Sequence, residues 1–171
     1  MGETRAPTFR IRIARMTTYP WRHILITGAS SGLGRALAEA CAASTVTLHL
    51  SGRDPARLAE AASACRARGA TVHDATLDVT DAHAMAGWIR DAGPLDFVIA
   101  NAGVSGGTGE ATEPPAQAAR IFATNVTGVL NTALPAIEVM AAQAPGADGL
   151  RGRIAVIASI AAFVAAPGAP A

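Results

Sequence analysis

The sequence predicts an α/β fold built on one doubly wound parallel sheet. Five short apolar runs alternate along the 171 residues with stretches of helical composition, most of them rich in alanine. The runs are continuously apolar, which is typical of parallel strands that are covered on both faces. No shift of composition marks an internal boundary, so we expect a single domain over 21–171.

Each expected strand is a compact apolar run bounded by glycine or polar residues. The first, HILITG, ends at Gly28, and the last, GRIAVIAS, ends at Ser159. Short bounded runs of this kind predict strands, and their alternation with helices predicts parallel pairing. The expected strands lie at 23–28, 46–52, 71–78, 95–103 and 152–159.

The stretches between the strands have helical composition, and one of them has clear end signals. Asp54 is placed to cap its start, Pro55 suits the first helical position, and Gly69 is a stop. Pro135 is expected to kink the last and longest helix. The expected helices lie at 33–44, 54–70, 81–93 and about 116–142.

Composition and charge argue against several function classes. The formal charge of +1 provides no general attraction to nucleic acid or to an anionic membrane. The longest apolar run, 154–166, is too short to span a bilayer. Cys41 and Cys65 lack paired-cysteine spacing and are expected to be free thiols, which suits a reducing cytoplasm. We expect no metal site, because no metal-ligand spacing links His23, His49, His73 and His83.

A basic leader over 1–20 precedes the expected domain. Its first fifteen residues contain four arginines and one glutamate, and they lack the apolar core of a secretory signal. The segment is either a flexible basic arm or the result of a start codon assigned too early, with the true start at Met16. We favour the second interpretation.

A glycine-rich loop, TGASSGLG (27–34), joins the first expected strand to the first helix. Its first glycine permits a tight turn, and the next two permit close approach of backbone to ligand and of helix to strand. The free amides of the helix N-terminus then face a pyrophosphate, so the loop predicts dinucleotide binding. The expected contact residues are Gly28, Ser30, Ser31, Gly32, Leu33 and Gly34.

The spacing Thr-Gly-x-x-x-Gly-x-Gly resembles that of the short-chain dehydrogenase/reductase family, and the resemblance extends from about residue 21 onward. It implies a Rossmann-like sheet with strand order 3-2-1-4-5. It also implies hydride transfer between a nicotinamide dinucleotide and a small carbonyl or alcohol substrate. Members of the family are commonly homo-oligomers, so we expect the full-length protein to be one.

The end of the second expected strand bears on the choice of dinucleotide. Enzymes that use NAD usually place an acid here for the ribose hydroxyls, whereas this chain has Ser51, Gly52 and Arg53. A guanidinium suits a 2′-phosphate, so we expect NADP(H), with NAD(H) remaining open. The alternative is that Arg53 is an ordinary exposed loop arginine.

Two further segments match the family in order and spacing. LDVTD (77–81) resembles the segment that contacts the adenine, which implies that role for Asp78 and Val79. ANAG (100–103) resembles the family's Asn-Asn-Ala-Gly, with alanine replacing the first asparagine. The resemblance places the remaining residues on the ribose and nicotinamide side, namely Asn101, Ala102 and Gly103.

The resemblance supplies only part of the family's catalytic set. It assigns a proton-relay role to Asn125 and a substrate-positioning role to Ser159. The family's Tyr-x-x-x-Lys is missing, since Tyr19 is the sole tyrosine and every basic residue is arginine. A positioned acid or base contributes roughly 10² to 10⁴ in rate, so we expect this chain alone to be inactive. The alternative function is a non-catalytic NADP(H)-binding module.

Overall fold

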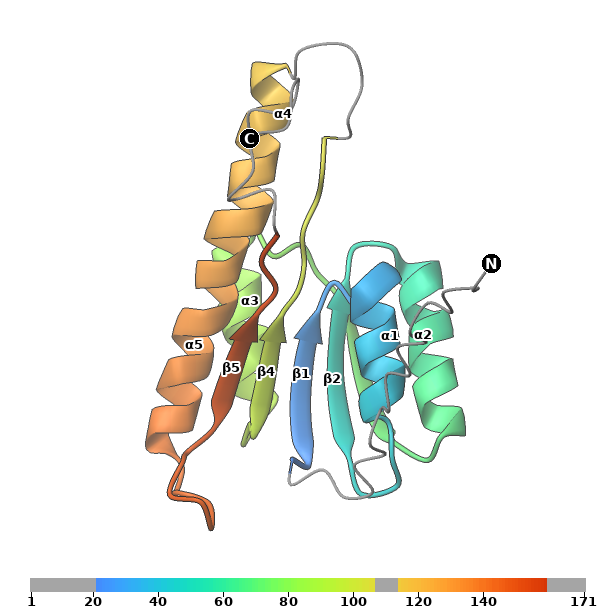
Figure 1. The fold of residues 1–171 in the computed structure, drawn as a ribbon, viewed down its shortest axis with the longest axis vertical. Helices are drawn as coiled ribbons and strands as arrows, with labels where there is room; N and C mark the ends of the chain where they lie inside the picture. The colour runs from blue at the N-terminus through green and yellow to red at the C-terminus, as the bar shows by residue number, and fades with distance from the viewer. Residues whose placement is uncertain (1–20, 107–113, 160–171) are drawn as a thin grey trace, which may run out of the picture.

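A computed structural model describes residues 21–106 and 114–159. These residues form a parallel sheet of order β3-β2-β1-β4-β5, which confirms the expected fold class and strand order (Figure 1). The strands are β1 (His23–Thr27), β2 (Thr47–Gly52), β3 (Thr71–Thr76), β4 (Phe97–Ala100) and β5 (Arg153–Val156). The helical segments are α1 (Gly32–Cys41), α2 (Pro55–Ala67), α3 (Ala82–Asp91), α4 (Pro115–Phe122), η1 (Ala123–Thr127) and α5 (Gly128–Ala142). The leader, with Met16 and Tyr19, lies outside the described residues, as do 160–171.

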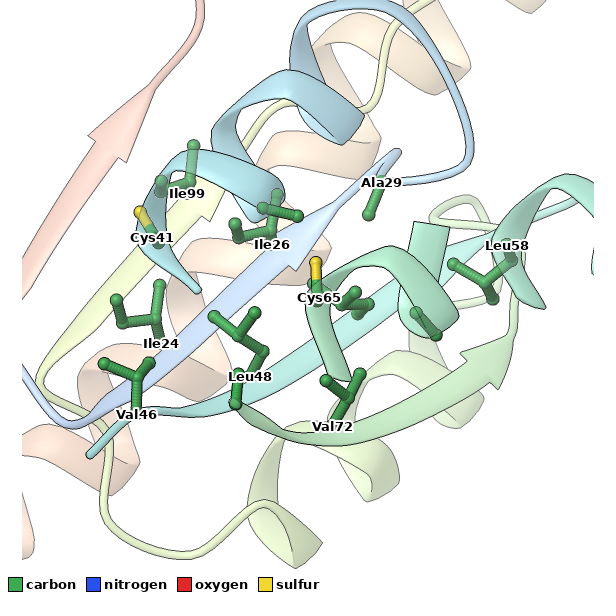
Figure 2. Packing of buried hydrophobic residues seen from close by; sticks show 14 residues of the cluster. Ile24, Ile26, Ala29, Cys41, Val46, Leu48, Leu58, Cys65, Val72 and Ile99 are labelled. Atoms are coloured by element: carbon green, nitrogen blue, oxygen red, sulfur yellow. The ribbon is translucent and has the colours of Figure 1, made fainter. Parts of the chain in front are cut away.

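The inner strands β1, β2 and β4 are buried on both faces, which explains why their sequences are mainly apolar. Ile24 and Ile26 of β1 point toward α1 and α2, where they join the cluster that also contains Leu48 and Leu58 (Figure 2). Leu25, between the two isoleucines, belongs to a second cluster with residues of α3 and α5. Alternate side chains of one strand therefore fill opposite cores.

The helix that carries the clearest end signals forms as expected. Asp54 caps α2, with its Oδ1 accepting a hydrogen bond of 3.1 Å from the backbone N–H of Arg57. Pro55 is the first residue of α2, and Gly69 follows its end with a φ of +93°. The free cysteines are buried as well, Cys41 on α1 and Cys65 on α2, and burial raises the pKa of both thiols.

The last helical segment departs from α-helical geometry at an unexpected place. Pro135 is buried inside α5, which continues on both sides of it, and the kink expected there stays a prediction. A π-helical turn that we did not predict, Ala123–Thr127, precedes α5 and contains Asn125. Figure 1 shows α4 and α5 as one long column that rises above the carboxyl ends of the strands. Its solvent face carries several half-exposed apolar side chains, namely Phe122, Val126, Leu130, Leu134 and Ile137.

A buried histidine makes the stability of this fold sensitive to pH. His49 of β2 is 7% exposed, and its ring stacks on that of His73 at 5.1 Å between centroids. Its Nε2 atom has no hydrogen-bond partner in the described part of the chain. Burial, reinforced by His73 and His23, lowers the pKa of His49 to about 4. The fold therefore holds His49 neutral at pH 7.

We expect this histidine to contribute stability that is present above pH 6.5 and lost as the pH falls toward 4. Between pH 7 and pH 5 the loss is about 2 kcal/mol, because the unfolded chain binds the proton more tightly. Urea unfolding at several pH values should show a flatter profile for His49→Leu than for the parent chain. His83→Leu provides the control, because His83 is exposed, and its profile should match that of the parent chain. Equal profiles for the parent and His49→Leu would contradict the prediction.

Candidate functional site

A cavity of about 410 Å³ opens at the carboxyl ends of the strands. The glycine loop, the end of β2 and the residues after β4 form its walls. All of the expected cofactor-binding residues except Asp78 line it. Its lining residues are Gly28, Ser30, Ser31, Gly32, Leu33, Gly34, Ser51, Gly52, Arg53, Asp54, Arg57, Leu77, Val79, Asn101, Ala102, Gly103 and Thr124.

Two glycines of the loop are required by its geometry. Gly28 has a φ of +68°, which L-residues with a side chain rarely adopt, and a Cβ there would lie 2.8 Å from the Cα of Ala102. A Cβ at Gly34 would overlap the carbonyl oxygen of Gly28 and lie 2.5 Å from the side-chain nitrogen of Asn101. The first turn of α1 can therefore pack against the loop only without a side chain at Gly34.

Thr27 and Asn101 hold the loop to the segment that follows β4. The Thr27 hydroxyl accepts hydrogen bonds of 3.1 Å from the backbone N–H groups of Asn101 and Ala102. In return, the Asn101 side-chain amide donates to the carbonyls of Thr27 at 3.0 Å and Gly28 at 3.3 Å. We did not predict this role for Thr27, because its partners lie 74 and 75 residues away along the chain.

The rim of the cavity carries two arginine–aspartate pairs. Arg53 Nη1 lies 3.8 Å from Asp78 Oδ2, and Arg57 Nε lies 3.5 Å from Asp54 Oδ2. Desolvation raises the pKa of the Asp78 carboxyl, but hydrogen bonds from Thr80 and the charge of Arg53 outweigh it and leave the pKa below its ordinary value. The sequence analysis missed Arg57 as a cavity residue, although its place in the first turn of α2, just after Arg53 and Asp54, is a signal that could have revealed it.

Val79 forms part of the cavity floor. Its side chain is buried in the cluster between the sheet, α3 and α5, and it also lines the cavity. Its carbonyl accepts a hydrogen bond of 2.8 Å from Asn131 Nδ2 of α5. This bond ties the segment after β3 to the long helix.

The two expected catalytic residues lie near the same edge of the sheet. Asn125, in the π-helical turn, binds both backbone groups of Val104: its Oδ1 accepts at 2.8 Å and its Nδ2 donates at 2.9 Å. Ser159 is exposed and follows Ile157, whose N–H donates to the carbonyl of Ala100. Pairing of β5 with β4 thus delivers Ser159 to the carboxyl edge, beyond the cavity lining.

Comparison with known proteins assigns the family. Residues 22–171 match the short chain dehydrogenase family. The chain belongs to the short-chain dehydrogenase/reductase family. It is 42% identical to an oxidoreductase of Myxococcus xanthus, over 68% of this chain and 48% of that protein. It is 33% identical to a 3-dehydrosphinganine reductase of Arabidopsis thaliana, over 75% of this chain and 40% of that protein. The chain thus spans less than half the length of these two relatives.

Solved short-chain dehydrogenases share the fold. A family member from Burkholderia phymatum in complex with NAD has a TM-score of 0.76 at 27% identity, over 86% of this chain and 52% of that one. A 3-ketoacyl-ACP reductase from Sinorhizobium meliloti has a TM-score of 0.68 at 32% identity, over 80% of this chain and 53% of that one. Among the described residues of this short-chain dehydrogenase, no group of three potential metal ligands is close enough to bind an ion, and no helix is long and apolar enough to cross a bilayer.

Proposed function

We propose that this chain is the NADP(H)-binding part of an oxidoreductase that transfers a hydride between NADP(H) and a small carbonyl or alcohol substrate. The observation that carries the cofactor preference is Arg53, which lines the cavity at the end of β2. An acid that accepts the ribose hydroxyls of NAD would stand at this point. Asp54 is a poor substitute, because its carboxylate caps α2. Arg57, on the same wall, adds a second positive charge.

The lining fits a dinucleotide in its chemistry. The amides at the start of α1 and the open position at Gly32, where an added Cβ would meet no protein atom within 4 Å, suit a pyrophosphate, which needs close approach of N–H donors. On this proposal Asp78 and Val79 contact the adenine, and the guanidinium of Arg53 faces the 2′-phosphate. The nicotinamide ring supplies the hydride when the cofactor is bound. The residues proposed on the ribose and nicotinamide side are Asn101, Ala102 and Gly103.

The substrate chemistry belongs to the whole protein in this proposal. Asn125 fixes the backbone of Val104 after β4, and we propose that it also supports the proton relay. Ser159 would position the substrate oxygen. The chain contains no lysine, and Tyr19 precedes β1, so this segment lacks the proton donor that the reaction requires. The second candidate function is a nucleotide-binding module without activity of its own. A cytoplasmic homo-oligomer remains our proposal for the complete protein.

Fluorescence titration of the purified chain with NADPH and with NADH tests the cofactor assignment. The parent chain is expected to bind NADPH more tightly than NADH. Arg53→Asp should weaken NADPH binding by about 10- to 100-fold, because a charged hydrogen bond is replaced by repulsion. NADH binding should be unchanged or tighter, since NADH has no 2′-phosphate.

Arg90→Asp provides the matched control, because Arg90 is exposed on α3 and lies outside the cavity lining. Failure of the parent chain to bind either nucleotide would refute the proposed function. An unchanged preference in Arg53→Asp would refute the role of Arg53 alone.

A further inference from the structure

Arg53, the arginine proposed for the 2′-phosphate, faces a carboxylate of this chain. Its Nη1 atom lies 3.8 Å from Oδ2 of Asp78, and the two side chains are 53% and 41% exposed. The register between β2 and β3 sets this proximity, because Gly52 stands opposite Thr76 and the two residues follow the paired ends. Any anion that binds Arg53 must therefore compete with Asp78.

The two oxygens of the Asp78 carboxylate have separate partners. Oδ1 accepts hydrogen bonds from the backbone N–H of Thr80 at 2.9 Å and from its hydroxyl at 2.8 Å. Oδ2 faces Arg53. The first pair of bonds fixes the turn that leads from β3 toward α3, whereas the second contact lies at the rim of the cavity. One atom of the side chain thus supports the fold and the other meets the arginine.

We propose that Asp78 is a specificity-setting residue that weakens the preference for nucleotides with a 2′-phosphate over nucleotides with a free 2′-hydroxyl. The inference rests on the proposed function, because it concerns the same cavity. A 2′-phosphate carries a charge of about −1.5 to −2 and must draw Arg53 away from Asp78. It also comes close to the carboxylate, which repels it. A 2′-hydroxyl needs neither change, so NADH binds with the ion pair intact.

The Asp78→Asn substitution separates the two tasks of the side chain. Asp78→Asn keeps an oxygen for Thr80 and places an uncharged NH₂ group toward Arg53. We expect the ratio of the NADH to the NADPH dissociation constant to rise about three- to tenfold. The substitution removes the exposed ion pair between Arg53 and Asp78 and the repulsion between Asp78 and the 2′-phosphate, and both changes favour NADPH. Because any adenine contact is common to both nucleotides, it cancels in this ratio. Asp78→Ser, which also keeps an oxygen without the charge, should give the same direction if Asp78→Asn folds poorly.

Asp74→Asn is the matched control. Asp74 lies on β3, the strand that leads to Asp78, and pairs with Arg66 at 2.6 Å, but neither Asp74 nor Arg66 lines the cavity. This variant removes the same charge and should leave the ratio unchanged. A double variant completes the test: in an Arg53→Ala background, Asp78→Asn should change the ratio less than in the parent chain. Raising the salt concentration should likewise reduce the effect.

The outcomes separate the inference from the function on which it rests. If the parent chain binds neither nucleotide, the proposed function and the inference about Asp78 are both overturned. If the parent chain prefers NADPH through Arg53 and Asp78→Asn leaves the ratio unchanged or lowers it, only the inference is overturned. An equal change with and without Arg53 would also overturn it, because Asp78 would then not act through that arginine.

Discussion

Replacing Gly34 by alanine is expected to lower the free energy of unfolding by about 3 to 5 kcal/mol and to abolish nucleotide binding, because overpacking against backbone cannot be relieved by a rotamer change. The added Cβ would overlap the carbonyl oxygen of Gly28 and crowd the Asn101 amide. Relief requires α1 to move away from the loop or the Asn101 amide to be displaced, and displacement of the amide breaks its hydrogen bonds to Thr27 and Gly28. Chemical denaturation and NADPH titration of the variant measure the two effects.

Gly87→Ala is the matched control for this substitution. Gly87 lies inside α3, and a Cβ at that position meets no atom within 4 Å outside its own helix. Alanine is the better helix former, so this variant should be more stable by about 0.5 to 1 kcal/mol. Similar stability of Gly34→Ala and the parent chain would show that the loop and α1 do not pack as described.

Thr27→Val is expected to cost about 3 kcal/mol, since it removes the acceptor of two partly buried backbone N–H groups while keeping the side-chain shape. The N–H groups of Asn101 and Ala102 would each lose a bond of 3.1 Å. Because these residues line the cavity, NADPH binding should weaken along with the stability.

Thr27→Ser separates the hydroxyl from the methyl group. Serine keeps the acceptor and loses one methyl, so the expected cost is about 1 kcal/mol. Urea denaturation of both variants measures the difference. If Thr27→Val and Thr27→Ser lower the free energy of unfolding equally, the two hydrogen bonds do not provide the stabilisation, and packing of the methyl group does.

The fold could be predicted from the sequence because its signals are local. Burial on both faces leaves an apolar run in the inner strands, as in HILIT of β1. Asp54 and Gly69 mark the two ends of α2 by their own chemistry. The π-helical turn at 123–127 has no such marker in its sequence, so it was not predicted.

The candidate site could be predicted only in part, for a related reason. The glycine loop and Arg53 follow strands directly, so their place at the carboxyl edge is implied by the strand pattern. The Thr27–Asn101 bonds and the Arg53–Asp78 pair depend on the register between strands. Residues 74 positions apart meet in the first case, and composition carries no trace of such a contact. The roles assigned to Asn125 and Ser159 stay predictions.

The Asn101 carboxamide ties the glycine loop to the central part of the sheet. It joins the end of β1, the first glycine of the loop and the segment after β4. Loops that bind ligands commonly belong to the least stable, locally opening parts of a protein. Here the first glycine of the loop and the end of β1 are hydrogen-bonded to a residue that follows the adjacent strand β4, so opening of the loop at Gly28 breaks a bond to the sheet edge. We therefore expect the loop to unfold together with the sheet, so that the entropy of ordering it is lost when the chain folds rather than when a nucleotide binds.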